Sequence, residues 1–168
     1  MKFIILLFFI SCSLFAKGQA YFLVGASVDE LERKTTISLQ NKEYRETSYS
    51  LNLTLGQEFE SYRYSLNMIK HDHLITFVSL DYLYPSLLEG NTKSFIGLSL
   101  GSARFKKLVY EDSKNNSSSS LVAAIQAGFT ANEIEFGYRY FFIDKEYTDN
   151  IDTEKLKYLH SIYFALKF

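Results

Sequence analysis

The segment Tyr49-Ser-Leu-Asn-Leu-Thr-Leu-Gly56 alternates strictly between apolar and polar or small residues. Successive side chains of an extended chain point to opposite sides, so Tyr49 and the three leucines share one face. The serine, asparagine, threonine and glycine share the other face. The segment therefore predicts a β-strand with one apolar and one polar side.

The same period of two recurs along a chain of 168 residues, which is enough for one domain. Seven further segments show it, at residues 21–28, 61–69, 78–84, 95–101, 121–129, 134–142 and 158–168. Short turns are expected at residues 57–61, 85–92 and 130–133, and longer polar loops at 29–46, 107–117 and 144–155. A tight connection at 70–73 interrupts this alternation. The pattern predicts an all-β, eight-stranded, antiparallel up-and-down barrel.

A soluble sandwich also alternates, but three features favour a membrane. The apolar faces carry no Asp, Glu, Lys or Arg, and a charge at the bilayer midplane of a barrel costs about 2–4 kcal/mol. The opposite faces are polar and rich in small residues, which suits a narrow interior. Aromatic residues on the apolar faces gather near the short turns, as in an interfacial girdle. These aromatic residues are Tyr62, Tyr82, Tyr84, Phe136, Phe164 and Phe168.

The last strand, Tyr158-Leu-His-Ser-Ile-Tyr-Phe-Ala-Leu-Lys-Phe168, resembles the C-terminal insertion signal of Gram-negative outer-membrane barrels. Its alternating apolar residues are Ile162, Phe164, Leu166 and Phe168. The chain after its N-terminal segment resembles the small eight-stranded barrels typified by outer-membrane proteins A and X, also called porin-like or opacity-type proteins. The resemblance implies residence in the bacterial outer membrane, contact with its lipid and lipopolysaccharide, and assembly by periplasmic chaperones and the barrel-assembly machinery. The sequence departs from the family in lacking Trp, in the tight connection at 70–73, and in having no glycine around 161–163.

The N-terminus has the parts of a secretory signal. Lys2 supplies a positive charge, residues 3–10 are apolar, and small residues follow. The apolar run is shorter than the roughly 18 residues of a spanning helix. We therefore expect residues 1–20 to be a signal peptide, cleaved after Ala16 or Ala20, and residues 21–168 to form the barrel. The only cysteine, Cys12, lies in this segment, so the mature protein is expected to have no thiol chemistry.

Composition excludes several classes of function. The net charge is −1 and the isoelectric point is about 6.3, so there is no basic footprint for nucleic acid. A mean hydropathy of −0.07 is too polar for a bundle of membrane helices. Gly97 and Gly101 lie within one strand segment and do not form a phosphate-binding loop, and we expect no cofactor.

Five charged residues fall on the polar faces and are expected to meet in the lumen. They are Arg63, Asp81, Glu135, Arg139 and Lys167. An eight-stranded barrel is about wide enough for side chains to fill it. The favoured interpretation is an internal network of salt bridges and hydrogen bonds that plugs the barrel, and the alternative is the lining of a selective pore.

The histidines give little support for metal binding or catalysis. His71 and His73 flank Asp72 in a turn that we expect to be solvated, and two imidazoles with one carboxylate make a poor metal site. His160 and Ser161 invite comparison with lipid A deacylase barrels, but adjacent strand residues point to opposite sides of the wall. No catalytic residue is therefore predicted.

The leading hypothesis is a non-enzymatic outer-membrane barrel that acts in envelope integrity or in surface interaction through its extracellular loops, where scaffolds usually carry function. One alternative is a secreted or periplasmic lipocalin-like barrel that binds a small apolar ligand. Another is a barrel enzyme that modifies lipid A. The lipocalin-like alternative requires Leu51, Leu98 and Phe164 to point inward.

Overall fold

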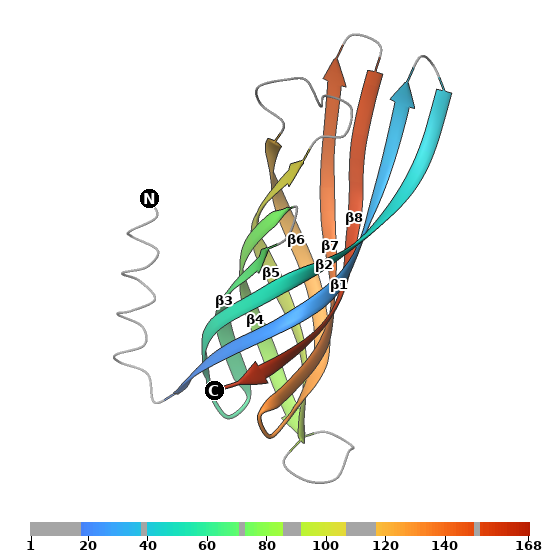
Figure 1. Cartoon of the computed structure of the whole chain (residues 1–168). Coiled ribbons are helices and arrows are strands. Elements are labelled where there is room, and N and C mark those ends of the chain that lie inside the picture. Colours follow the sequence, from blue (N-terminus) through green and yellow to red (C-terminus); the bar gives the residue numbers. More distant parts are fainter. Residues whose placement is uncertain (1–17, 38–39, 71–72, 86–91, 107–116, 150–151) are drawn as a thin grey trace.

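The computed structural model describes residues 18–37, 40–70, 73–85, 92–106, 117–149 and 152–168. These residues form a closed barrel of eight antiparallel strands that pair in sequence order, and β1 pairs with both β2 and β8 (Figure 1). The strands are β1 (Gln19–Ile37), β2 (Gln40–Glu58), β3 (Tyr62–Lys70), β4 (Leu74–Pro85), β5 (Thr92–Lys106), β6 (Ser117–Ala131), β7 (Ile134–Asp149) and β8 (Asp152–Lys167). The predicted eight-stranded up-and-down fold is confirmed. Within the described part of the chain, no helix has the length and apolar character needed to cross a bilayer.

The two sides of the barrel wall differ as the alternation predicts. In β4, Asp81 is 1% exposed while the adjacent Leu80 is 60% exposed. Leu51, Leu98 and Phe164 point outward, with exposed fractions of 49%, 68% and 48%. The lipocalin-like alternative required these three residues inside, so it is wrong.

Strands β1, β2, β7 and β8 continue past their neighbours on one side of the barrel (Figure 1). β2 pairs with β3 only from Leu51 onward, and β7 pairs with β6 only as far as Phe142. Beyond these points the four strands form a sheet in the order β2-β1-β8-β7. We call this the projecting sheet; it comprises residues 29–37, 40–50, 143–149 and 152–158.

The projecting sheet corrects two sequence predictions, because residues 29–46 and 144–155 were expected to be loops. They are mostly strand, and only residues 38–39 and 150–151 lie outside the described residues. Oppositely charged residues hold this part of the sheet together across strands: Arg33 Nε lies 2.9 Å from Glu46 Oε2, and Arg45 Nη1 lies 3.5 Å from Glu30 Oε1. The pattern was misread because the outer face is polar here and the inner face mixes Leu31 with polar residues such as Arg33, so the apolar–polar alternation is lost. Residues 107–116 of the third expected loop lie outside the described residues.

The pairing of β1 with β8 that closes the barrel continues to Phe22 and Phe168 at the short-turn end. The Phe22 amide donates to the Phe168 carbonyl (3.1 Å), and the Phe168 amide donates to the Phe22 carbonyl (2.8 Å). The β6–β7 turn contains only Asn132 and Glu133, with Asn132 at a φ of 52°, a left-handed conformation that asparagine tolerates well. Of the other predicted connections, 71–72 and 86–91 lie outside the described residues.

Candidate functional site

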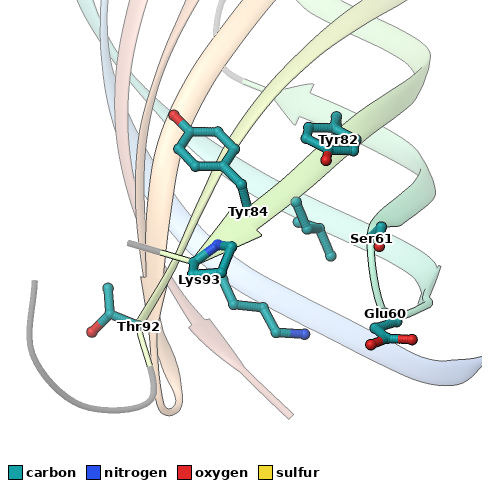
Figure 2. Close-up of a pocket in the computed structure, with 8 residues that line it drawn as sticks. Glu60, Ser61, Tyr82, Tyr84, Thr92 and Lys93 are labelled. Carbon is teal, nitrogen blue, oxygen red and sulfur yellow. The ribbon is translucent and has the colours of Figure 1, made fainter. Parts of the chain in front are cut away.

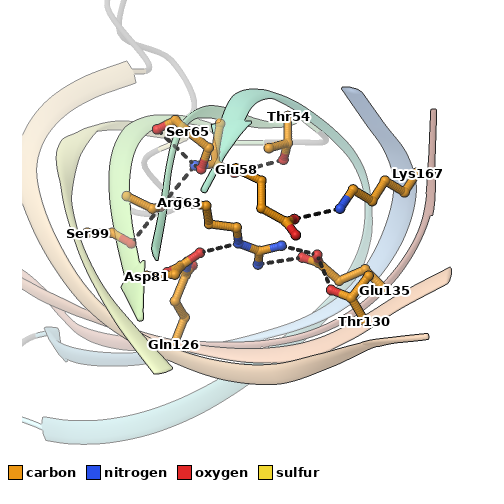
Figure 3. Close-up of polar contacts among 12 residues, drawn as sticks. Thr54, Glu58, Arg63, Ser65, Asp81, Ser99, Gln126, Thr130, Glu135 and Lys167 are labelled. Carbon is orange, nitrogen blue, oxygen red and sulfur yellow. Dashed lines mark hydrogen bonds and ion pairs between the residues drawn. The ribbon is translucent and has the colours of Figure 1, made fainter. Parts of the chain in front are cut away.

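The centre of the lumen is occupied by Arg63, which β3 aims across the barrel (Figure 3). Its Nε donates to Asp81 Oδ2 on the neighbouring strand (2.7 Å), and its Nη2 donates to Glu135 Oε1 on the far wall (3.1 Å). A second ion pair joins Arg63 Nη1 to Glu135 Oε2. The three side chains are only 1–2% exposed. A bidentate, charge-assisted contact between a guanidinium and a carboxylate is among the stronger polar interactions in proteins.

Both carboxylates have further donors, so neither depends on Arg63 alone. Gln126 Nε2 donates to Asp81 Oδ1 at 2.5 Å. Glu135 accepts from Thr130 Oγ1 at 3.0 Å and from the Tyr163 hydroxyl at 2.8 Å. Burying charge is tolerable when every polar atom is satisfied in this way.

Aromatic rings enclose the two buried arginines. The Arg63 guanidinium carbon lies 4.2 Å from the centre of the Phe95 ring, and that of Arg139 lies 3.7 Å from the centre of the Tyr163 ring. These are favourable cation–π distances. Gly97 makes room for this layer, because a Cβ at that position would lie 1.8 Å from Asp81 Oδ1.

Arg139 belongs to the same interior but not to the same ion pairs. It donates from Nε to Gln126 Oε1 and from Nη1 to Asn52 Oδ1, both at 3.2 Å. Gln126 therefore links Arg139 to Asp81. Among the described contacts, Arg139 forms no direct salt bridge to a carboxylate.

Lys167 lies apart, at the short-turn rim. Its Nζ is 2.6 Å from Glu58 Oε2 (Figure 3). Lys93 Nζ is 2.9 Å from Glu58 Oε1. Glu58 was missed in the sequence because it lies at the end of β2, in a segment expected to be a turn. Of the five predicted lumen charges, the structure thus joins three directly, attaches Arg139 through an amide, and places Lys167 in a separate rim cluster.

Polar and apolar layers fill the rest of the lumen. Above Arg63, Asn67 accepts from Thr54 Oγ1 (2.7 Å) and donates to Ser79 Oγ (2.9 Å). Toward the projecting sheet follows an apolar cluster that the sequence analysis did not predict. Its members are Leu31, Ile69, Ile75, Phe77, Ala103, Phe105, Val122, Ala124, Phe141, Ile143, Leu156 and Leu159. Consecutive apolar residues, such as Phe141-Phe142-Ile143, were the available signal.

His73 is buried, which corrects the expectation of a solvated turn. It is 6% exposed, its ring lies 5.7 Å from that of Phe105, and its Nε2 is 3.5 Å from Asp29 Oδ2. Ser50 donates to the same carboxylate. His73 is therefore a lumen residue that faces Asp29, while residues 71–72 lie outside the described residues.

The structure keeps apart His160 and Ser161, the two residues considered for a lipid A-modifying enzyme. His160 lies on the outer face, where its Nδ1 is 2.6 Å from the Tyr138 hydroxyl. Ser161 points into the lumen and is fully buried. A nucleophile must lie within hydrogen-bond reach of its base, and these two side chains are on opposite sides of the wall.

The outer surface carries aromatic residues at the short-turn end, together with a pocket. Side chains from the β2–β3 turn, the end of β4 and the start of β5 surround this pocket (Figure 2). Its lining residues are Glu60, Ser61, Tyr82, Leu83, Tyr84, Pro85, Thr92 and Lys93. A second, almost wholly apolar pocket adjoins it at Tyr82 and runs along the outer faces of β4 and β5. Aromatic and charged side chains side by side are typical of the level of lipid headgroups.

The projecting sheet carries charges on its outer face. Lys157 Nζ donates to Glu32 Oε1 (3.3 Å) and to Glu43 Oε1 (3.4 Å). These hydrogen bonds, from Glu32 first and then from Glu43, raise the pKa of Lys157 above its usual value. The charges are therefore paired along the sheet, yet they remain at the surface.

A closed eight-stranded barrel with an apolar outer belt and a lumen filled by side chains is the fold of the small outer-membrane β-barrels. No protein-family model and no curated protein matches the sequence. Solved structures that resemble it include Neisserial surface protein A, 18% identical, with 91% of this chain and 100% of that chain covered and a TM-score of 0.52. Outer membrane protein H (OprH) of P. aeruginosa is 20% identical, with coverages of 88% and 99% and a TM-score of 0.51. OprG of Pseudomonas aeruginosa is 12% identical, with coverages of 90% and 97% and a TM-score of 0.50.

At these identities the likeness shows the fold, and it confirms the predicted resemblance to small eight-stranded outer-membrane barrels. A barrel of this fold with this apolar exterior is a protein of the bacterial outer membrane. In this class the short turns face the periplasm and the longer connections face outward. By this rule we expect the projecting sheet to lie on the extracellular side.

Proposed function

We propose that the protein is a non-enzymatic outer-membrane barrel that acts in surface interaction through its projecting sheet. The observation that supports this is the continuation of β1, β2, β7 and β8 beyond the barrel wall as an ordered sheet. The residues there point charged side chains outward, and a rigid sheet presents a binding surface at a lower entropic cost than a flexible loop. A role in envelope integrity is the second candidate, supported by the densely bonded lumen.

Shortening the two projecting hairpins separates these candidates. Residues 33–44 and 147–154 can each be replaced by an Asn-Gly turn, because Glu32 pairs with Arg45 and Glu146 pairs with Lys155. We expect the shortened protein to keep its heat-dependent gel mobility, and its cells to lose surface binding or aggregation while remaining resistant to detergent. Intact binding with a permeable envelope would instead support the envelope-integrity role.

We propose that the lumen cluster of Arg63, Asp81, Glu135 and Arg139 plugs the barrel, with Lys167 closing its periplasmic rim. The buried, mutually bonded side chains support this assignment. In planar bilayers we expect no stable conductance from the purified protein. Regular single-channel openings would contradict the proposal and favour a pore.

We propose that the protein is exported and inserted into the membrane in the same way as other outer-membrane β-barrels. The apolar residues of the proposed insertion signal point outward, with 45–73% of their surface exposed, which supports recognition by the assembly machinery. They are Ile162, Phe164 and Leu166 on β8 and Phe168, which follows it. Cleavage of the signal peptide is proposed after Ala16, because β1 begins at Gln19 and the Gly18 carbonyl accepts from Gln57 Nε2 (3.0 Å). N-terminal sequencing of the mature protein tests this, and a start at Tyr21 would contradict it.

A further inference from the structure

The outer edge of the projecting sheet has a backbone available for pairing. β2 pairs with β1 along its whole length, but β3 reaches only as far as Leu51 of β2. Residues 40–50 therefore have no strand on their second side within the described part of the chain, and Figure 1 shows β2 as the outermost strand of the sheet. The unpaired N–H and C=O groups of such an edge are a template for another strand.

The sequence of this edge is complementary to itself in charge. Lys42 and Glu43 precede Tyr44, and Arg45 and Glu46 follow it. In an antiparallel pair of two copies centred on Tyr44, Glu43 lies opposite Arg45, and Lys42 lies opposite Glu46. Two-fold symmetry repeats each contact, so four pairs of opposite charges surround one tyrosine pair. A parallel pairing in register would place each charge next to its own kind, which is destabilising.

The faces of the strand allow these contacts. Residues directly opposite each other in an antiparallel pair point to the same side. Glu43 and Arg45 lie on the outer face, where they contact Lys157 and Glu30, and Glu46 lies on the inner face with Arg33. Lys42 and Tyr44 share the inner face with Glu46 by alternation.

The side chains remain accessible despite their contacts within the chain. The exposed fractions of the Glu43, Arg45 and Glu46 side chains are 63%, 72% and 40%. Tyr44 is 42% exposed, unlike the buried aromatic residues of the lumen. A partner strand on the free edge would therefore meet available charges and an available ring.

We propose that the partner of the projecting sheet is a second copy of this chain, joined by antiparallel pairing of β2 residues 40–48 about a two-fold axis at Tyr44. This proposal rests on the proposed role in surface interaction. β2 runs from the tip of the sheet toward the membrane, so antiparallel pairing turns the two barrels in opposite directions. The contact joins barrels of two facing membranes, and in detergent it gives a head-to-head dimer. The interface is isologous and closes at two copies.

Cysteine trapping tests the register. Only position 44 lies opposite itself, and opposed Cα atoms of an antiparallel pair are about 4.5–5.5 Å apart, within reach of a disulfide. The full chain carrying Y44C, purified from outer membranes and oxidised mildly, should give a covalent dimer. T47C and N41C should each stay monomeric, but an equal mixture of the two should form the mixed dimer, because Thr47 lies opposite Asn41. The parent chain is the control, because it shows whether Cys12 alone can form a disulfide. Failure of Y44C to cross-link, or equal cross-linking of T47C alone, would overturn the proposal.

Charge reversal tests the chemistry on cells. E43R places an arginine opposite Arg45, and R45E places a glutamate opposite Glu43, so each variant should lose self-aggregation of cells that display it. Mixed populations of the two should aggregate, because the opposite charges then meet across the pair. The double variant E43R/R45E should aggregate with itself as the parent does. Surface exposure and heat-dependent gel mobility confirm that each variant is folded. Aggregation that ignores these reversals would overturn the homotypic contact.

These outcomes are distinguishable from failure of the proposed function. If the cysteine and charge-reversal variants behave as monomers while shortened hairpins still abolish binding to other surfaces, the projecting sheet binds a different partner. If shortened hairpins have no effect on any surface binding, the proposed function itself fails.

Discussion

Strand β1 passes through two environments, and the character of its outward face changes between them. From Phe22 to Val28 the outward residues are uncharged, while the inward residues beside them include Ser27 and then Asp29, which is fully buried. Beyond that point, Glu30 and the next outward residues are charged or polar, while the inward face remains mixed, with Leu31 2% and Arg33 4% exposed. We expect the wall to leave the bilayer at the level where the outward face changes, between Val28 and Glu30.

The comparison shows that the same charged groups have different consequences on the two sides of this level. In the lumen, Arg63 and its carboxylates are removed from water and depend on each other. In the projecting sheet, Arg45 and Glu30 are 72% and 43% exposed and remain solvated. Stability should therefore be sensitive to changes in the first set and insensitive to changes in the second.

The largest effect is expected from Glu135→Ala. It removes both Glu135 contacts from Arg63 and leaves the buried guanidinium with Asp81 as its one carboxylate partner among the described residues. Breaking a buried pair by deleting one partner costs about 3–5 kcal/mol. Urea unfolding in lipid vesicles measures the change, and Glu30→Ala in the projecting sheet is the matched control.

The double variant Glu135→Ala with Arg63→Met separates charge burial from lost packing. Replacing the unpaired cation by an apolar side chain should restore part of the stability. If the double variant is less stable than Glu135→Ala alone, Arg63 stabilises the lumen without Glu135.

A charge on the outer belt is expected to have the next largest effect. Leu98→Arg places a cation on the lipid-facing side of β5, where Leu98 is 68% exposed, at a cost of about 2–4 kcal/mol. Thr47→Arg, on the exposed outer face of β2 above the membrane, should change stability by less than about 0.5 kcal/mol. Equal effects of the two substitutions would place the membrane boundary elsewhere.

The sequence predicts correctly which side chains point inward and which point outward in the part of the barrel whose outer face contacts lipid. There, a polar residue such as Arg63 between apolar neighbours can only point inward, so its face follows from alternation. Which residues meet across the lumen did not follow. Arg63 and Glu135 lie 72 positions apart, and their meeting depends on the tilt and stagger of all eight strands.

The projecting sheet and the upper lumen were missed for a related reason. Residues 40–48 of β2 are polar on both faces except at Tyr44, so they have the composition of a loop. In the upper lumen both faces are apolar, as at Ile75 and Phe77 beside Val78, so alternation again gives no signal. His73 was assigned to water because its partner, Asp29, was itself placed in a loop.

Gly97→Ala should have an intermediate effect. The added Cβ would lie 1.8 Å from Asp81 Oδ1 and 2.7 Å from the Leu80 carbonyl oxygen, so the Asp81 side chain must move away from Arg63. Overpacking of this kind typically costs about 1–3 kcal/mol. Ser94→Ala on the same strand, near the rim, is the control in the same unfolding assay. A neutral Gly97→Ala would show that the lumen is loosely packed and would weaken its assignment as a plug.

The smallest effect is expected from Arg45→Ala, and its salt dependence is the sharpest test of the comparison. Arg45 Nη1 lies 3.5 Å from Glu30 Oε1 and both side chains are largely in water, so the pair should contribute about 0–1 kcal/mol. Because the Debye length falls to about 3 Å at 1 M salt, even this difference from the parent should vanish there. The loss in Glu135→Ala should persist at the same salt concentration if the lumen is plugged as proposed, because a plug would keep ions away from Arg63. If salt removed both losses, water and ions would reach Arg63, and the lumen would have to be regarded as an open channel.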